Sequence, residues 1–341
     1  MDLFGRERFL GEMEVMAPPA SESPRRPRAW PSNVALGVIV VLGAVLAGEG
    51  VLRWQELVDP PVFEANPHYG YLMQPNQVVS PRGRPFRINN AGFRGADFAW
   101  SKPNGTLRLV FLGDSITYGG GRIEDDALFV NRTATALAGG LRPVEAVNLA
   151  APGWGVQNIA AYVRLKGVPE ADAVIWVLPA VDFRRPKTTM EDHDFPFRKP
   201  RSRLLYVASA VRRDLRGLGA WPVREETLAL NVEAFRRTLE LVGDGGTPAV
   251  VVAVPMERGY GNLHDALATF GAAAKALSVP FLDMGPVFER RRGERLFFDG
   301  VHLSVQGHEV LASAITAFLR ERGEWASGDV RRRSRSPSPS R

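Results

Sequence analysis

Three residues of this chain have the types that nucleophilic catalysis by a serine requires. Ser115 lies in the small, polar turn Gly113–Gly119, which directly follows an apolar run, so its hydroxyl is expected at an exposed rim of the fold. A serine hydroxyl is a weak nucleophile until a neighbouring base accepts its proton. His302 could be that base, and Asp299, three residues earlier, could hold the imidazole in the tautomer whose Nε2 accepts the proton. The residue types therefore predict a triad of Ser115, His302 and Asp299.

The remaining histidines stand in contexts that need no catalytic role: His68, His193, His264 and His308. His308 lies at the start of the last predicted helix, where a capping or surface role suffices. Asp192, His193 and Asp194 could ligate a metal in principle, but no second histidine lies within a turn of them, so a charged loop explains them better. The sequence thus indicates neither a metal site nor a cofactor.

The elements around the predicted triad indicate an α/β fold. Short, β-rich apolar runs alternate with segments of helical period, which is the pattern of a parallel sheet covered by helices on both faces. Ligands bind beyond the carboxyl ends of the strands in such sheets, and Ser115 directly follows the first run. We therefore predict a three-layer α/β/α fold with a five-stranded parallel sheet. Its strands are expected at Leu107–Leu112, Val144–Leu149, Ala173–Leu178, Ala249–Val254 and Val279–Asp283.

An apolar segment precedes this domain. Residues 29–48 carry no charge, and Trp30 and Trp54 bracket roughly 36 Å of helix, which suits a bilayer with an aromatic belt on each side. Arginines at 25, 26 and 28 place the N-terminus in the cytoplasm by the positive-inside rule, and the domain outside. We favour a transmembrane anchor at 29–54. A signal peptide cleaved near Ala47 is the alternative, and it exports the domain as well.

The rest of the chain divides by composition. Residues 1–28 form a polar leader, and residues 55–104, rich in Pro, Asn and Gly, predict short strands and turns before the main domain at 105–326. The net charge of +6 comes mostly from the Arg/Ser tail at 327–341, which we expect to be disordered and which gives little reason to expect a nucleic-acid partner. The absence of cysteine excludes disulfides, zinc sites built on thiolates and cysteine catalysis.

Taken together, residues 107–320 resemble the GDSL/SGNH hydrolase superfamily, whose sheet is flavodoxin-like. The resemblance lies in Gly113-Asp114-Ser115, in the glycine block at 148–155 and in the Asp-x-x-His spacing of Asp299 and His302. It implies a serine esterase in which the backbone N–H groups of Ser115 and Gly153 bind the oxyanion of a tetrahedral intermediate. A tight turn alone would also account for the glycine.

The third sequence block departs from this family. Its members have Gly-x-Asn-Asp, in which the Asn side chain is the third oxyanion donor, whereas this chain has Pro179-Ala180-Val181-Asp182. Val181 cannot donate a hydrogen bond, and loss of one such donor typically lowers turnover by about 10²–10³. This change leaves three alternatives open. The protein could be a slow hydrolase, it could use an oxyanion donor from another loop, or it could have lost its activity. Asp182 would repel an oxyanion unless protonated, so we assign it no donor role.

The segment Asn89–Gly95 resembles one found in the membrane-anchored, exported branch of the superfamily. Relatives there are linked to adding or removing acyl groups, often acetyl, on envelope glycans. The resemblance implies an esterase acting on an acylated glycan or a small ester outside the cytoplasm. An O-acyltransferase, which shares the acyl-serine intermediate, and a glycan-binding protein of weak activity are the alternatives. The insertion at 184–224 could cover the site or form a solvated excursion with one short helix near 203–216, and the oligomeric state stays open.

Overall fold

The computed structural model describes residues 30–55, 58–81, 83–138, 142–193, 195–215 and 225–323. The predicted polar leader at 1–28 and the predicted tail at 327–341 lie outside the described residues. The chain divides into two compact units, Met1–Ala47 and Gly48–Arg341.

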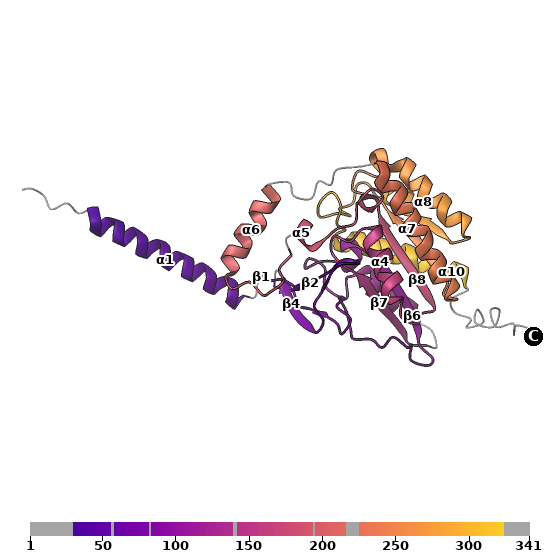
Figure 1. Cartoon of the computed structure of the whole chain (residues 1–341), viewed down its shortest axis with the longest axis horizontal. Coiled ribbons are helices and arrows are strands. Elements are labelled where there is room, and N and C mark those ends of the chain that lie inside the picture. Colours follow the sequence, from indigo (N-terminus) through magenta and orange to yellow (C-terminus); the bar gives the residue numbers. More distant parts are fainter. Residues whose placement is uncertain are drawn as a thin grey trace, which may run out of the picture. The chain divides into compact units, whose positions relative to one another are not determined.

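The first unit contributes most of one long helix. Helix α1 (Trp30–Trp54) begins in this unit and ends in the second (Figure 1). Its apolar side chains are exposed, including Ile39 and Leu46. The helix is long and apolar enough to cross a membrane by length and composition, a test that a signal sequence would pass as well.

The second unit is built on the predicted five-stranded parallel sheet, whose strand order is β10-β9-β8-β6-β7. Four strands follow the predicted runs closely. The fifth begins at Phe281 rather than Val279, because Pro280 has no N–H for the ladder and contributes only its carbonyl, which accepts from Val251 N. The strands are β6 (Leu107–Gly113), β7 (Val144–Ala150), β8 (Ala173–Pro179), β9 (Ala249–Val254) and β10 (Phe281–Asp283).

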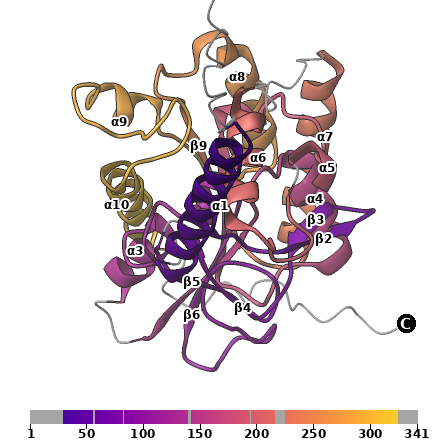
Figure 2. The same ribbon diagram turned by 90° about the vertical axis from the view of Figure 1, so that its left-hand side faces the viewer.

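Helices cover both faces of this sheet and make it the middle of three layers (Figure 2). Alternate residues of β6 enter different cores, since successive side chains of a strand point to opposite faces. Val110 and Leu112 pack with α4 (Val156–Lys166), α7 (Glu225–Asp244) and α8 (His264–Ala276). Leu109 and Phe111 pack on the other side with the elements α3 (Phe129–Leu137), α9 (Gly285–Glu289) and α10 (Val305–Arg322).

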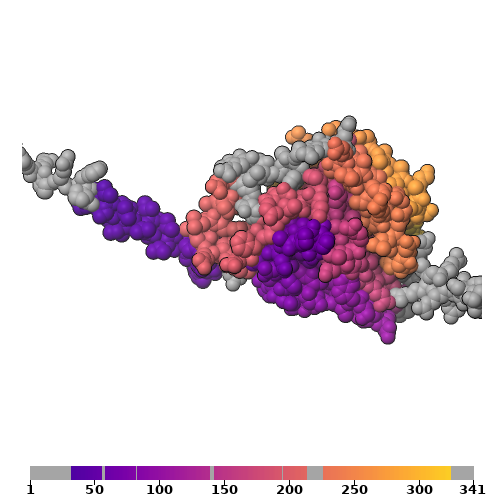
Figure 3. All heavy atoms as spheres, in the orientation of Figure 1, coloured from indigo at the N-terminus to yellow at the C-terminus, as the bar shows by residue number. Residues whose placement is uncertain are grey.

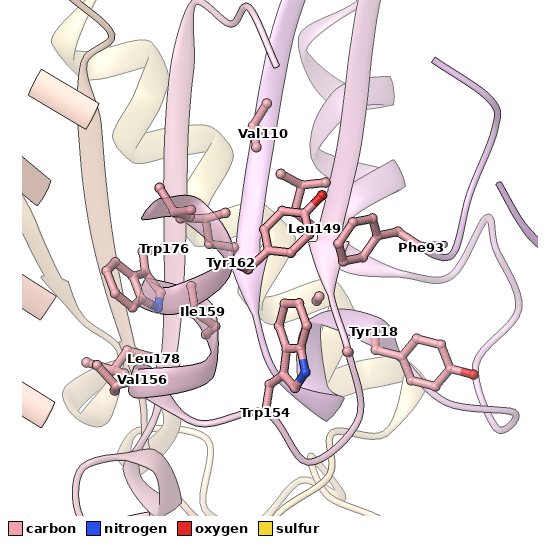
Figure 4. Close-up of a cluster of buried hydrophobic side chains, with 14 of the residues drawn as sticks. Phe93, Val110, Tyr118, Leu149, Trp154, Val156, Ile159, Tyr162, Trp176 and Leu178 are labelled. Carbon is pink, nitrogen blue, oxygen red and sulfur yellow. The ribbon is translucent and has the colours of Figure 1, made fainter. Parts of the chain in front are cut away.

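The residues before β6 form short antiparallel strands, as their composition predicts. One small sheet has the order β1-β4-β5, and β2 pairs with β3 in a second. Side chains from this segment, including Tyr71 and Phe93, are fully buried and join the first core. Figure 4 shows Phe93 in this core with Trp154 and Tyr162. Its atoms, indigo and purple in Figure 3, pack against the magenta atoms of the sheet-bearing domain. The strands are β1 (Val58–Asp59), β2 (Phe63–Asn66), β3 (Gly70–Met73), β4 (Gln77–Pro81) and β5 (Phe86–Ile88).

The insertion after β8 contains a short helix α5 (Met190–His193) and, as expected, a further helix α6 (Arg203–Leu215). The N-terminus of α6 is tied to Glu49, whose carboxylate accepts hydrogen bonds from Arg203 N at 2.9 Å and Leu204 N at 3.0 Å. These backbone donors lower the pKa of Glu49 to about 2. The remaining short elements are α2 (Ser115–Tyr118), η1 (Ala180–Asp182) and η2 (Gly261–Leu263).

Candidate active site

Ser115 lies at the carboxyl end of β6, where the strand turns abruptly into α2. Gly113 permits this turn, because a Cβ there would lie 2.1 Å from Thr117 Oγ1. Asp114 caps the helix by accepting a hydrogen bond from Ile116 N at 2.8 Å. The neighbouring strand β7 secures the same turn, since Asn148 Nδ2 donates to Thr117 O at 2.8 Å. The serine is therefore held on a short, well-anchored element.

His302 and Asp299 lie in the loop before α10, and the structure brings them to Ser115. His302 Nε2 is 3.0 Å from Ser115 Oγ, although 187 positions separate the two residues. His302 Nδ1 is 3.0 Å from Asp299 Oδ2 and 3.1 Å from Oδ1. These are the contacts that let a serine transfer its proton to an imidazole whose other nitrogen donates to a carboxylate.

Asp299 is oriented by its own backbone turn. Its Oδ1 accepts hydrogen bonds from His302 N at 2.8 Å and Val301 N at 3.0 Å. Partial burial raises the pKa of Asp299, but these N–H groups and the imidazole outweigh it and hold the pKa below its usual range. The carboxylate is thus charged at neutral pH and can stabilise an imidazolium. Nearly half of each of the two side chains is exposed, so this part of the site opens to solvent.

A cavity of about 290 Å³ adjoins these residues. Its described lining includes Ser115, Pro152, Asp299 and His302, together with the loop 119–123, but neither Gly153 nor Val181.

Arg94, from the segment before β6, supports the loop that lines this cavity. It is 1% exposed, donates to Ile123 O at 2.6 Å and Gly120 O at 2.5 Å, and pairs with Asp125. Arg94 belongs to the segment Asn89–Gly95, and no local pattern in the sequence predicts its contact with this loop.

Gly153 lies in a tight turn formed by residues 151–154. Its φ is +77°, and Trp154 N donates to Ala151 O at 3.3 Å. Proline followed by a glycine of positive φ is the pattern of a type II turn. A Cβ at this position would lie 2.3 Å from His193 Nε2 and 2.8 Å from the Tyr71 hydroxyl. The turn therefore requires glycine whether or not its N–H binds an oxyanion, and the donor role stays a prediction.

The altered third block lies at the carboxyl end of β8. Val181 is partly buried in η1, and Asp182 beside it is fully buried. Burial raises the pKa of Asp182 well above its usual range, and the nearby guanidinium of Arg185 opposes this effect. Arg185 Nη1 lies 3.2 Å from Asp182 Oδ1 and 3.7 Å from Asp114 Oδ2. Asp114 Oδ2 in turn accepts from Ser115 Oγ at 3.2 Å, so a buried charge cluster extends to the serine.

His308 corrects one expectation, because it is buried and contacts the start of α3 rather than capping its own helix or facing solvent. It is 1% exposed, its ring stacks on Phe129, and its Nδ1 accepts a hydrogen bond from Phe129 N at 3.3 Å. Burial lowers the pKa of His308 to about 3, so the imidazole is neutral at physiological pH. Although it lines the cavity, its hydrogen bond and burial make it a packing residue rather than a second base.

Of the three side chains considered for a metal, Asp192 and His193 belong to α5, and Asp194 lies outside the described residues. Among the described residues, no group of three His, Asp or Glu side chains is arranged to hold a metal ion. His193 ends α5 and packs between aromatic rings, with its ring centroid 4.9 Å from that of Phe195 and 5.6 Å from that of Tyr71.

Comparison with known proteins gives a family and several distant structures. The model of the GDSL-like lipase/acylhydrolase family matches residues 111–310. No curated protein sequence matches this chain. A lipase/acylhydrolase from Enterococcus faecalis is 18% identical with a TM-score of 0.43, and the match covers 63% of this chain and 96% of that one.

Two carbohydrate esterases are similar to the same degree. A catalytic mutant of an acetylxylan esterase from Geobacillus stearothermophilus is 19% identical with a TM-score of 0.45, covering 64% of this chain and 95% of that one. A two-domain esterase active on acetylated mannans is 16% identical with a TM-score of 0.44, covering 69% of this chain and 53% of that one.

Proposed function

The chain belongs to the GDSL-like lipase/acylhydrolase family and is a serine hydrolase of ester bonds, and we propose that Ser115, His302 and Asp299 are its catalytic residues. The observation that carries this proposal is the continuous contact from Asp299 Oδ2 through the imidazole to Ser115 Oγ, with both heavy-atom distances at 3.0 Å. The location of the three residues beside a cavity supports it further.

In the proposed reaction, Ser115 Oγ attacks the acyl carbon while His302 Nε2 accepts the hydroxyl proton. Asp299 holds the imidazole and stabilises its charged form. The oxyanion of the tetrahedral intermediate accepts hydrogen bonds from the N–H groups of Ser115 and Gly153. His302 then returns the proton to the leaving alcohol, which leaves an acyl group on Ser115. A water molecule, deprotonated by the same imidazole, releases the carboxylic acid and restores the serine.

We propose short acyl groups, acetyl in particular, carried on a glycan as the substrate. The cavity of about 290 Å³ lies at the lower end of the range for ligand sites, and a short acyl group fits inside it whole. The exposed fraction of 46% for the His302 side chain leaves room for a bulky alcohol component to approach from solvent. A polymer that presents its ester at the surface fits this combination.

Chain-length preference tests the substrate proposal. We expect kcat/KM for p-nitrophenyl acetate to exceed that for the octanoate by about tenfold or more, as a site shaped for a short acyl group requires. The measurement is steady-state hydrolysis of acetate, butyrate and octanoate esters, with release of acetate from an acetylated xylooligosaccharide as a second assay. A preference for the octanoate would contradict a short-acyl site while leaving the triad proposal intact.

We also propose that residues 29–54 anchor the protein in a membrane, with the hydrolase domain outside the cytoplasm. The length and apolar composition of α1 support this proposal, and so does the arginine cluster before it. An alkaline phosphatase fused after residue 326 should be active and should sediment with membranes. Activity of a fused cytoplasmic reporter would contradict the orientation. A soluble product shortened by about 47 residues would indicate a cleaved signal peptide instead.

A further inference from the structure

One peptide group links the proposed oxyanion donor to the segment that precedes the sheet. The Pro152 carbonyl and the Gly153 N–H belong to the same planar peptide, and Tyr71 OH donates a hydrogen bond to that carbonyl at 2.7 Å. Tyr71 lies on β3 and is fully buried, outside the residues that match the family. Its hydroxyl therefore contacts the group whose opposite end is the predicted donor.

The hydrogen bond from Tyr71 to the Pro152 carbonyl also fixes the orientation of the Gly153 N–H. In a trans peptide the C=O and N–H point in opposite directions, so a hydrogen bond that fixes the carbonyl also fixes the N–H. Type I and type II turns differ by a flip of this central peptide, and Pro152-Gly153 occupies the central positions of its turn. A flip would point the N–H toward Tyr71 and the carbonyl away from it. The tyrosine hydroxyl opposes the flip, because it offers its proton to the carbonyl in only one of the two orientations.

Further contacts hold the tyrosine and the turn together. Trp154 Nε1 donates to Tyr71 O at 3.0 Å, which joins the turn to the backbone of β3. Thr188 Oγ1, from the insertion, donates to Gly153 O at 2.8 Å and so restrains the next peptide. Asn158 Oδ1 accepts from Thr188 N at 3.0 Å and from Gly155 N at 3.2 Å. The turn is thereby restrained by two segments that lie far from it in the sequence.

We infer that Tyr71 is a positioning residue for the oxyanion site, an inference that rests on the proposed function of Gly153. Its hydroxyl keeps the Gly153 N–H directed toward the acyl oxygen. It also polarises the peptide, since a hydrogen bond accepted by the carbonyl strengthens the N–H at the other end as a donor. Val181 supplies no third oxyanion donor, whereas an asparagine at this position would. The orientation of the Gly153 N–H therefore matters more in this chain than in family members that have the asparagine.

Removal of the Tyr71 hydroxyl tests the inference. In Tyr71→Phe the ring is kept, so we expect kcat for p-nitrophenyl acetate to fall about tenfold with KM unchanged, less than the ~10²–10³ lost with a whole oxyanion donor. Affinity for an alkyl boronic acid, whose adduct on Ser115 is tetrahedral, should weaken by a similar factor. Rates are expressed per active site titrated with a fluorophosphonate, so that misfolded protein does not contribute.

Tyr162→Phe is the matched control, because Tyr162 is buried in the same aromatic cluster and no described hydrogen bond joins its hydroxyl to the turn. Thr188→Val should have a smaller effect than Tyr71→Phe, since Thr188 donates to the following peptide and reaches the donor's peptide only through a long 3.4 Å contact with the Tyr71 hydroxyl. This variant also keeps the comparison measurable if Tyr71→Phe folds poorly. An effect of Thr188→Val on kcat equal to or larger than tenfold would then overturn the assignment of the central peptide.

Other results distinguish failure of the positioning role of Tyr71 from failure of the proposed catalytic mechanism. If wild-type protein turns over esters and Tyr71→Phe matches it in kcat and boronate affinity, the positioning role is wrong and the triad proposal stands. Equal losses of kcat in Tyr71→Phe and Tyr162→Phe, accompanied by equal falls in melting temperature, would also overturn the role. If the wild-type protein never acylates on Ser115, the proposed function fails and the inference falls with it.

Discussion

Replacement of Ser115 by alanine is expected to abolish acyl-enzyme formation and to lower ester turnover by about 10⁴–10⁶-fold. Ser115 Oγ is the only atom of the proposed triad that forms a covalent bond to the substrate, so no neighbouring group replaces it once it is removed. Ser115 Oγ also lies within hydrogen-bond distance of both His302 Nε2 and Asp114 Oδ2, and neither of these groups forms an acyl-enzyme on this pathway. Fluorophosphonate labelling, read by intact mass, and hydrolysis of p-nitrophenyl acetate measure the two effects.

Ser313→Ala is a suitable control, because Ser313 is exposed on α10 outside the described lining of the active-site cavity. Labelling and turnover of this variant should equal those of the wild type. A membrane-tethered glycan-binding protein of this fold predicts a different set of results. It would show no labelling of Ser115 in the wild type and unchanged binding of an acetylated glycan in Ser115→Ala. That pair of results would refute the proposed mechanism and leave the fold unchanged.

Val181→Asn is expected to increase turnover of a small ester, by at most the ~10²–10³ that one oxyanion donor is worth. Val181 lies in η1, which begins where β8 ends, and β8 is the immediate neighbour of β6, whose carboxyl end carries Ser115. An amide side chain at this position starts from the adjacent strand end and can supply a donor that valine lacks. The gain should appear in kcat with little change in KM, because the added bond forms mainly in the transition state.

Val181→Leu is the control that distinguishes the effect of the new donor from the effect of side-chain size. Leucine resembles asparagine in size but has no side-chain N–H group. We expect this variant to be no faster than the wild type. Equal turnover in Val181→Asn and the wild type would mean that the new amide does not reach the oxyanion or that other donors already suffice. A similar gain in Val181→Leu would attribute the effect to packing around η1, where the buried Asp182 carboxyl lies 3.2 Å from Arg185 Nη1.

Much of the fold could be predicted because its signals are local. The strands of the main sheet are short runs of buried residues, and α7 and α10 follow apolar positions at helical spacing. The turn that carries Ser115 could be predicted from its small, polar residues next to a buried strand. The boundary at Val279 was wrong because a proline at position 280 outweighs the apolar character of the run.

The environment of single residues was harder to predict. His308 follows a glycine at the start of α10, a context that reads locally as a cap or a surface position. It is buried because α10 packs against α3, which lies 179 positions earlier at Phe129. Arg94 shows the same effect, since a charged residue beside a glycine is usually exposed. It is buried because the carbonyl groups of the 119–123 loop and the carboxylate of Asp125 satisfy its guanidinium.

The sequence by itself determined the α/β class, the positions of the strands along the chain and the residue types of the proposed triad. These properties follow from hydrophobic period and turn chemistry within a few residues. Only the tertiary structure decided that His302 Nε2 lies 3.0 Å from Ser115 Oγ, and that Tyr71 contacts the peptide of Gly153. Such contacts join segments 81 to 187 positions apart, and their geometry depends on how whole layers pack, which no local pattern encodes.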